Sequence, residues 1–266
     1  MIGGGPFALP PGAWTDDTAL ALCLADSLLA NPALDPADLL ARFHRWWEWG
    51  ENSATGVGIG IGRTTWAALA RFRAEGHLIA DDSAALASNG GIMRLAPVAI
   101  RFHASPEDAA RLARAQSLPT HAAPAALDAA ELLARILVAA IGGAGKAALT
   151  PPGAHPEDPG IAALAAGEWR GKRRDEVIAD GSARATLEAA LWAVCSADDF
   201  AAAVLLAANL GGDADTAAAI AGQIAGAVWG ASAIPETWLE NLVKVAHIRD
   251  RAERLYEAAG GSWAVG

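Results

Sequence analysis

Apolar residues recur at spacings of three and four along most of the chain, whereas runs of alternating apolar and polar residues are scarce. Ala, Leu, Glu and Arg at this spacing predict α-helices with one buried face. Helix-start signals, in which Ser or Asp precedes acidic residues, lie at residues 35–38, 105–108 and 196–199. We therefore expect an all-α fold, with a helix that starts at residue 36 and others over residues 16–30, 65–75, 109–115, 125–141, 184–194, 200–208, 215–229 and 238–259.

The pattern is interrupted mainly at residues 142–160, which are rich in Gly and Pro. Because the strongest chemical signals lie on both sides of this segment, we interpret it as a surface excursion inside one domain that spans residues 1–266. Residues 216–235 carry no charge and consist mostly of Ala and Gly. They predict a closely packed core helix rather than a membrane span, which needs about 20 strongly apolar residues. The last residues, 260–266, are expected to fray.

Composition narrows the class of protein. Of the 266 residues, 53% are hydrophobic and 19% are charged, which excludes an intrinsically disordered chain. The net charge of -10 argues against nucleic acid or an anionic membrane as a partner. The two cysteines, Cys23 and Cys195, form no disulfide framework, and the first residues show no signal-peptide pattern. We expect a cytoplasmic monomer.

Two acidic motifs, some 200 residues apart, each precede an apolar helix. In isolation each is explained by helix capping, because acids favour the first turn of a helix. Together they offer four carboxylates and flanking Thr hydroxyls, the oxygen ligands that a hard cation prefers, with no His or Cys at ligand spacing. We therefore favour a Mg²⁺ or Mn²⁺ site. The candidate ligands are Thr15, Asp16, Asp17, Asp213, Asp215 and Thr216.

Two glycine-rich loops and one histidine are further candidates. The first loop leads into a short helix and could offer backbone N–H groups to a phosphate, although Asn-Gly-Gly is also an ordinary turn. The second loop, residues 53–62, is either a flexible segment beside a ligand, with Gly56 as the candidate contact, or a plain surface loop. His121 is the only histidine placed like a site residue. The first loop contains Ser88, Asn89, Gly90, Gly91 and Met93.

In this order, the motifs Trp14–Thr18, Asn89–Arg94 and Gly211–Thr216 resemble those of the ADP-ribosylglycohydrolases. The resemblance implies an orthogonal multi-helix fold with a centre of two Mg²⁺ or Mn²⁺ ions, held by the six Thr and Asp residues named above. It also implies that residues 89–93 hold the pyrophosphate of ADP-ribose and that His121 lies near the nucleotide.

The chemistry implied by this resemblance is hydrolysis of the glycosidic bond that joins ADP-ribose to a modified protein side chain, with arginine as the first candidate. The metal ions would bind ribose hydroxyls and lower the pKa of a water. Asp16 or Asp17 would orient or deprotonate that water, and the carboxylates would stabilise an oxocarbenium-like transition state.

The chain also departs from the family pattern. It begins after the helix that usually carries Gly-Asp-Ala-Leu-Gly and a further acid. It has Gly60 where relatives often have an acid, and Ser182 near the place of a common aromatic residue. Two alternatives therefore stay open: an ADP-ribose-binding relative with weak or no catalysis, and a hydrolase of another conjugate, such as ADP-ribosyl-serine, a nucleobase or a small molecule.

Overall fold

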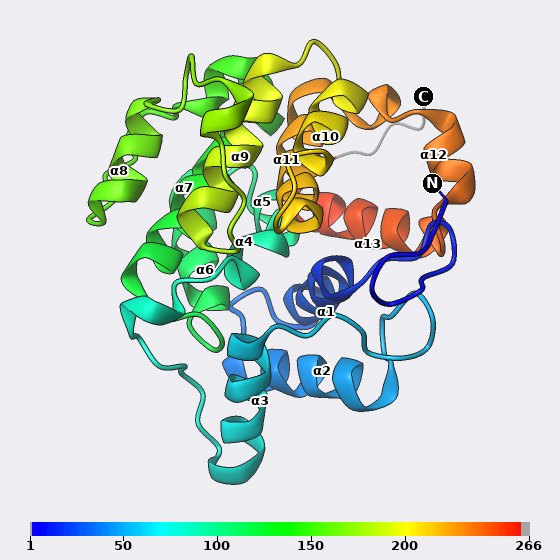
Figure 1. The fold of residues 1–266 in the computed structure, drawn as a ribbon. Helices are drawn as coiled ribbons and strands as arrows, with labels where there is room; N and C mark the ends of the chain where they lie inside the picture. Colours follow the sequence, from blue (N-terminus) through cyan, green and yellow to red (C-terminus); the bar gives the residue numbers. More distant parts are fainter. Residues whose placement is uncertain (1, 262–266) are drawn as a thin grey trace.

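The computed structural model describes residues 2–261, and the expected fraying of residues 260–266 falls mostly outside that range. Within residues 2–261 the chain forms helices and no strand, so the predicted all-α class is confirmed (Figure 1). The α-helices are α1 (Asp16–Ala30), α2 (Pro36–Trp49), α3 (Arg63–Glu75), α4 (Gly90–Met93), α5 (Ala96–Arg101), α6 (Pro106–Ser117), α7 (Pro124–Ala139), α8 (Pro159–Ala166), α9 (Ala183–Ser196), α10 (Phe200–Ala208), α11 (Ala214–Trp229), α12 (Glu236–Asn241) and α13 (Val245–Ala258).

Helix ends follow local chemistry, though not always at the expected residue. The Asp35 side chain accepts a hydrogen bond from the backbone N–H of Ala37 at the start of α2, as its Asp-Pro signal predicts. At α10 the cap is Asp199, which accepts from Ala202 N. Ser196, at the start of the predicted signal, instead ends the preceding helix α9. The signal located the helix correctly and misplaced its cap by three residues.

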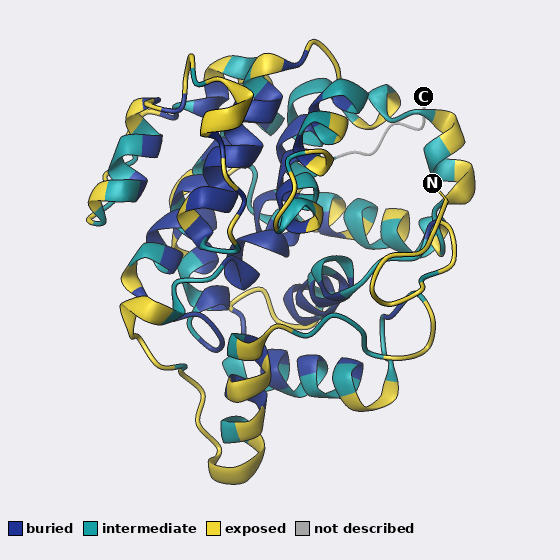
Figure 2. Cartoon of the chain, in the orientation of Figure 1, coloured by how far each residue is buried: buried dark blue, intermediate teal, exposed yellow. Residues whose placement is uncertain are grey.

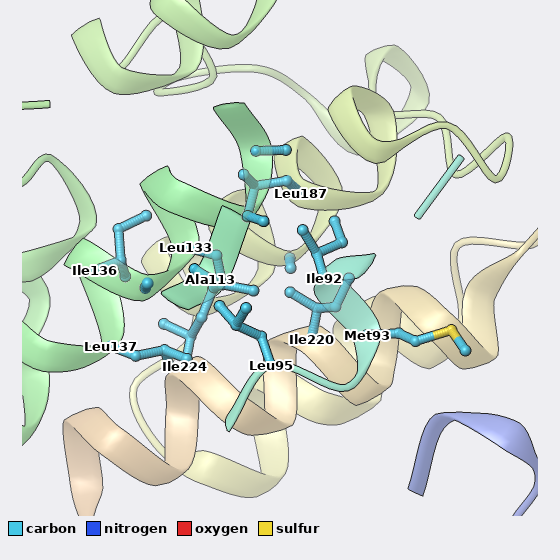
Figure 3. Close-up of a cluster of buried hydrophobic side chains, with 14 of the residues drawn as sticks. Ile92, Met93, Leu95, Ala113, Leu133, Ile136, Leu137, Leu187, Ile220 and Ile224 are labelled. Carbon is cyan, nitrogen blue, oxygen red and sulfur yellow. The ribbon is translucent and has the colours of Figure 1, made fainter. Parts of the chain in front are cut away.

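The core lies where α7, α9 and α11 pack together, and each of these helices has a buried face (Figure 2). Figure 3 shows side chains from α4, α7, α9 and α11 meeting in this core, among them Ile92, Leu133, Leu187 and Ile220. The predicted core helix over the uncharged stretch is α11. Its Gln223 donates hydrogen bonds to the carbonyls of Ile92 (3.2 Å) and Met93 (2.6 Å), which fixes α4 against the core.

One helical stretch in the described chain, Pro124–Leu149, is long and apolar enough to cross a membrane by length and composition. It contains α7, which packs against α6, α9 and α5 and has ten buried residues. Such burial is typical of the central helix of a globular core.

The single helix predicted over residues 238–259 is wrong, because the chain breaks between α12 and α13. Lys244 adopts a left-handed conformation (φ +54°), and Val243 donates a backbone hydrogen bond to Gly12 O (3.1 Å). Gly12 lies so close that a Cβ there would be 1.7 Å from the Asn241 carbonyl oxygen. The crossing of the N-terminal segment therefore ends α12, a long-range contact that helical spacing does not reveal.

The predicted irregular segment, residues 142–160, is also shorter than expected. Helical turns of π and 3₁₀ type continue from α7 through Ala140–Ala144 and Gly145–Leu149. The chain then runs irregularly until Asp158 caps α8 by accepting from Ile161 N (3.0 Å).

Truncation of a core leucine measures how much this packing contributes. Leu133→Ala should lower the free energy of unfolding by about 2–5 kcal/mol, because its side chain is 0% exposed and the cavity left behind cannot collapse fully. Leu205→Ala is the matched control, since Leu205 is 50% exposed and should lose less than about 0.5 kcal/mol. Urea unfolding followed by circular dichroism compares the two; equal losses would contradict the assigned core.

Candidate active site

A cleft of about 540 Å³ opens where the starts of α1, α3 and α11 face the loop that leads into α4. It is the place where both acidic motifs meet. The turn before α9 forms another part of its wall, with Asp180, Gly181 and Ser182. The cleft-lining residues that the sequence predicted are Thr15, Asp16, Asp17, Ser88, Asn89, Gly90, Met93, His121, Asp213, Asp215 and Thr216.

The two acidic motifs do not serve as ordinary helix caps. Thr15 occupies the capping position of α1 and Asp213 that of α11, yet neither side chain accepts a capping hydrogen bond from the helix backbone. Asp213 instead accepts a hydrogen bond from the Thr216 hydroxyl (3.2 Å). Capping alone therefore does not explain these motifs, and their side chains are turned to the cleft.

Burial in the cleft raises the pKa values of Asp16 and Asp17, and neighbouring carboxylates add to the shift. Burial raises the pKa of Asp16 to about 7; hydrogen bonds from its own backbone and Thr15 oppose the shift, and Asp215 and Asp213 add to it. Burial and then the charge of Asp16 raise the pKa of Asp17 well above its usual value. The Oδ1 atom of Asp17 is buried without a hydrogen-bond partner. Such mutual repulsion indicates a site built for positive charge.

Asn89 links three segments that are distant in sequence. Its amide nitrogen donates to Asp213 Oδ2 (2.5 Å) and Thr186 Oγ1 (3.0 Å), and its backbone N–H donates to Gly181 O (3.1 Å). Asn89 thereby orients one carboxylate of the second motif. Gly212 supports the same arrangement, because a Cβ there would lie 2.1 Å from the Ala179 carbonyl oxygen.

The glycines of the first loop allow close packing rather than flexibility. A Cβ on Gly90 would lie 2.4 Å from Cε1 of His121, and a Cβ on Gly91 would lie 2.3 Å from the Ser117 hydroxyl oxygen. Gly90 and His121 line the cleft, whereas Gly91 is buried behind it. Ser88 hydrogen-bonds the Thr64 hydroxyl (3.2 Å) at the cleft rim.

The sequence profile of the ADP-ribosylglycohydrolase family matches residues 1–264 of this chain. The chain belongs to the ADP-ribosylglycohydrolase family. The resemblance noted from its motifs is thereby confirmed.

Individual members of the ADP-ribosylglycohydrolase family agree with this assignment. The chain is 41% identical over 260 residues to the ADP-ribosylarginine hydrolase Tri1 of Serratia proteamaculans, covering 97% of this chain and 71% of the relative. It is 32% identical to the ADP-ribosyl-[dinitrogen reductase] glycohydrolase of Rhodospirillum rubrum, covering 98% and 84%. A solved structure described as an ADP-ribosylglycohydrolase-related protein complex matches with a TM-score of 0.84 at 41% identity, covering 97% of this chain and 86% of that one. The expected multi-helix fold of the family is confirmed.

The structure also locates the departures from the ADP-ribosylglycohydrolase pattern. Gly60 lines the cleft directly against the first motif, with φ +94°, and a Cβ there would lie 2.4 Å from Asp16 Oδ1. Ser182 caps α9 and also lines the cleft. Gly56, predicted as a ligand contact, lies outside the cleft lining: its N–H is bonded to Ser53 Oγ (2.8 Å) in a separate turn. From this glycine-rich loop, Gly60 and Gly62 line the cleft instead.

Sequence reasoning overlooked several residues of the cleft. Asp180 and Gly181 were missed because no sequence motif marks the turn that contains them. That turn is positioned by an isolated β-bridge between Ser88 and Ser182, which forms only in the folded chain. Thr186 was also missed: it is buried behind the cleft lining, and only the folded chain places its hydroxyl against the Asn89 amide.

The donor set of the cleft fits a hard divalent cation. The six predicted ligands, four carboxylates and two Thr hydroxyls, all line one cavity, and one of their carboxylate oxygens is buried without a partner. This set contains oxygen donors alone, which such a cation prefers. Among the described residues, no three acidic, His or Cys side chains already stand at ligand distance from one point.

The close contact at Gly90 gives a first prediction for the site. Gly90→Ala should displace the His121 ring and weaken ADP-ribose binding by about tenfold or more, equivalent to at least ~1.4 kcal/mol. Isothermal titration calorimetry would measure the affinity. Gly142→Ala is the control, because a Cβ at Gly142 meets nothing within 4 Å. Unchanged affinity in Gly90→Ala would contradict the packing described.

The raised pKa of Asp16 gives a second prediction. Its folded-state value of about 7 lies above that of an unfolded chain, so the stability it contributes is full below about pH 4 and is lost as pH rises through 7. Asn resembles the protonated acid. In EDTA, Asp16→Asn should therefore raise the free energy of unfolding more at about pH 8 than at about pH 5.

Urea unfolding at the two pH values measures this difference. Asp198→Asn, which changes an exposed acid, is the control and should give the same small effect at both. An Asp16→Asn effect that is independent of pH would show that Asp16 does not hold a proton in the metal-free fold.

Proposed function

We propose that this protein hydrolyses the N-glycosidic bond between ADP-ribose and a modified arginine side chain, releasing ADP-ribose. The observation that carries the proposal is the meeting of both Thr/Asp motifs with Asn89 in one cleft, in a chain 41% identical to ADP-ribosylarginine hydrolases of Serratia proteamaculans and Pseudomonas putida. The substrate is accordingly an ADP-ribosylated protein.

We infer that two Mg²⁺ ions, with Mn²⁺ as the alternative, are held by Thr15, Asp16, Asp17, Asp213, Asp215 and Thr216. When bound, such ions position ribose hydroxyls and a water and lower the pKa of that water. The raised pKa values of Asp16 and Asp17 support this ligand set, because nearby positive charge relieves the repulsion among the carboxylates.

The carboxylates of α1 carry the chemical step in this proposal. Asp16 or Asp17 orients the attacking water and accepts its proton, while the water oxygen forms a bond to the anomeric carbon of the distal ribose. The bond from that carbon to the arginine nitrogen breaks, and the nitrogen leaves with a proton. Positive charge that develops on the ribose is stabilised by the surrounding carboxylates.

Local donors must capture the anionic part of the substrate, since the net charge of -10 gives no long-range attraction. Ser88, Asn89, Gly90 and Met93 face the cleft at the start of α4, where the first N–H groups of a helix lack intrahelical partners. We assign the pyrophosphate to this loop and the nucleotide to the neighbourhood of His121.

A second candidate function is ADP-ribose binding with weak or no turnover. Gly60 favours it, because no side chain at this position can supply an acid beside Asp16. Hydrolysis of ADP-ribosyl-serine or another conjugate is a third possibility, and the chain is 28% identical to the human ADP-ribosylhydrolase ARH3 over 280 residues.

We further expect the protein to act as a cytoplasmic monomer, without a nucleic-acid or membrane partner.

Turnover of defined peptides tests the proposal. The protein should release ADP-ribose from an ADP-ribosyl-arginine peptide with Mg²⁺ and lose this activity in EDTA, as followed by mass spectrometry. Asp17→Asn should reduce the rate by about a hundredfold or more, in the range seen when a catalytic proton acceptor is removed. Asp198→Asn should leave the rate unchanged.

The other outcomes separate the alternatives. Release from the serine peptide alone would assign the other linkage. ADP-ribose binding without release from any peptide would favour the non-catalytic function, and neither binding nor release would refute the proposal.

A further inference from the structure

We propose that Arg94, acting through Thr120, fixes the proton of His121 on Nε2, so that the cleft presents a neutral histidine as a hydrogen-bond donor. In this proposal Arg94 and Thr120 are positioning residues, and neither lies in the predicted metal-ligand set. The placement of the proton rests on geometry alone; only the identity of the ligand that receives the hydrogen bond rests on the proposed function.

Arg94 is a fully buried cation in the middle of the fold. Its Nε donates to Gln116 Oε1 (2.9 Å), and its Nη2 donates to Gln116 O (2.8 Å) and Thr120 Oγ1 (2.8 Å). The guanidinium carbon also lies 4.6 Å from the centre of the Phe43 ring. These contacts fix the direction of each donor, because a guanidinium donates hydrogen bonds and accepts none.

The hydrogen bonds of Thr120 then determine the tautomer of its neighbour. Thr120 Oγ1 accepts from Arg94 and lies 2.8 Å from His121 Nδ1. Its single O–H must point to Nδ1, because Nδ1–H donation in the opposite direction would leave the hydroxyl hydrogen of a fully buried side chain without an acceptor. Nδ1 is therefore the acceptor, and the one proton of the neutral ring is on Nε2.

The neutral state of the ring follows from its surroundings. His121 is 2% exposed, and burial together with the nearby charge of Arg94 lowers its pKa to about 3. Its Nε2 lies on the side of Gly90, where a Cβ would come within 2.6 Å, and both residues line the cleft. A donor at this position suits a phosphoryl or ribose oxygen and disfavours a ligand that also presents a donor.

The same buried arginine supports the glycine loop. Because Gln116 Oε1 accepts from Arg94, its amide nitrogen points the other way and donates to Gly91 O (2.7 Å) and Ala113 O (3.1 Å). Arg94 thus orients His121 through Thr120, and it orients the carbonyl of Gly91 in the glycine loop through Gln116. The loop and the ring are thereby placed relative to each other before any ligand binds.

Nitrogen-15 NMR of histidine-labelled full-length protein tests the proton placement without ligand or activity. The His121 signals, assigned by their loss in His121→Gln, should show a protonated Nε2 and an unprotonated Nδ1 at neutral pH. Thr120→Val removes the hydroxyl with little change of shape and should shift the ring toward the other tautomer. Thr120→Ser keeps the hydroxyl and should restore the original pattern.

A protonated Nδ1 in the unchanged protein, or an unaltered pattern in Thr120→Val, would overturn the proposal. The circular dichroism spectrum and the thermal shift produced by Mn²⁺ alone should be the same in both Thr120 variants as in the unchanged protein. The reason is that Thr120 is not a predicted metal ligand. If Thr120→Val alone fails to fold, Thr120→Ser and Arg94→Lys test the proposal instead. Thr120→Ser should keep the proton on Nε2 of His121, and Arg94→Lys should lose this preference.

Binding of ADP-ribose supplies the functional readout. Thr120→Val should weaken it by roughly tenfold, the effect of one hydrogen bond to a charged acceptor, while Thr120→Ser should not. His121→Gln, whose amide N–H replaces the Nε2 donor, should bind more tightly than His121→Leu. Equal affinity of the Gln and Leu variants would overturn the donor role, whereas absence of ADP-ribose binding by the unchanged protein would refute the proposed function and leave the NMR result standing.

Discussion

Electrostatic repulsion among four carboxylates in one partly buried cleft is the constraint on which the rest of this structure depends. Asp16 and Asp17 begin one helix and Asp213 and Asp215 begin another, and burial raises the pKa values of the first two and of Asp213. A fold relaxes such repulsion by letting the acids turn to solvent or separate. Here Asp215 does turn to solvent, whereas Asp16 stays buried and Oδ1 of Asp17 is buried without a hydrogen-bond partner.

Hydrogen bonds at both ends of α4 position α11 beside the ligand loop. Gln223 of α11 bonds to the carbonyls that end α4, and Asn89 at the other end of α4 bonds to Asp213 at the start of α11. The helix that carries two of the acids is thus tied at two points to the loop that faces the ligand. Glycine at residue 90 lets the loop approach His121, and glycine at residue 212 lets the start of α11 approach the carbonyl of Ala179. The cleft is consequently assembled by contacts between segments that are more than a hundred residues apart.

A second buried charge, Arg94, organises the opposite wall of the cleft. Its hydrogen bonds reach Gln116 and Thr120, and its Nη1 has no partner. A buried cation costs stability unless hydrogen bonds and nearby opposite charge compensate for the lost hydration. In this fold it fixes the orientation of a histidine and of a loop carbonyl beside the ligand. Arg94 itself is fully buried and does not line the cleft, so it acts on the site only through the neutral side chains of Gln116 and Thr120.

Much of the helical architecture was predictable because its signals are local. The Asp35-Pro36 start, the apolar spacing of α1 and the uncharged run of α11 each predict their helix without reference to the rest of the chain. The break at Lys244 was not predictable, since it is imposed by Gly12 and its neighbours crossing from the other end of the sequence.

For the site, the sequence by itself determined which chemical groups are available: carboxylates and hydroxyls at two helix starts, a glycine loop and a histidine. Only the tertiary structure decided that Gly60 rather than Gly56 faces the acids, that the turn at Asp180 completes the wall, and that Thr120 occupies one nitrogen of His121. The physical reason is that residue type fixes what a group can donate or accept, whereas hydrogen-bond direction, burial and charge proximity arise from packing between distant segments.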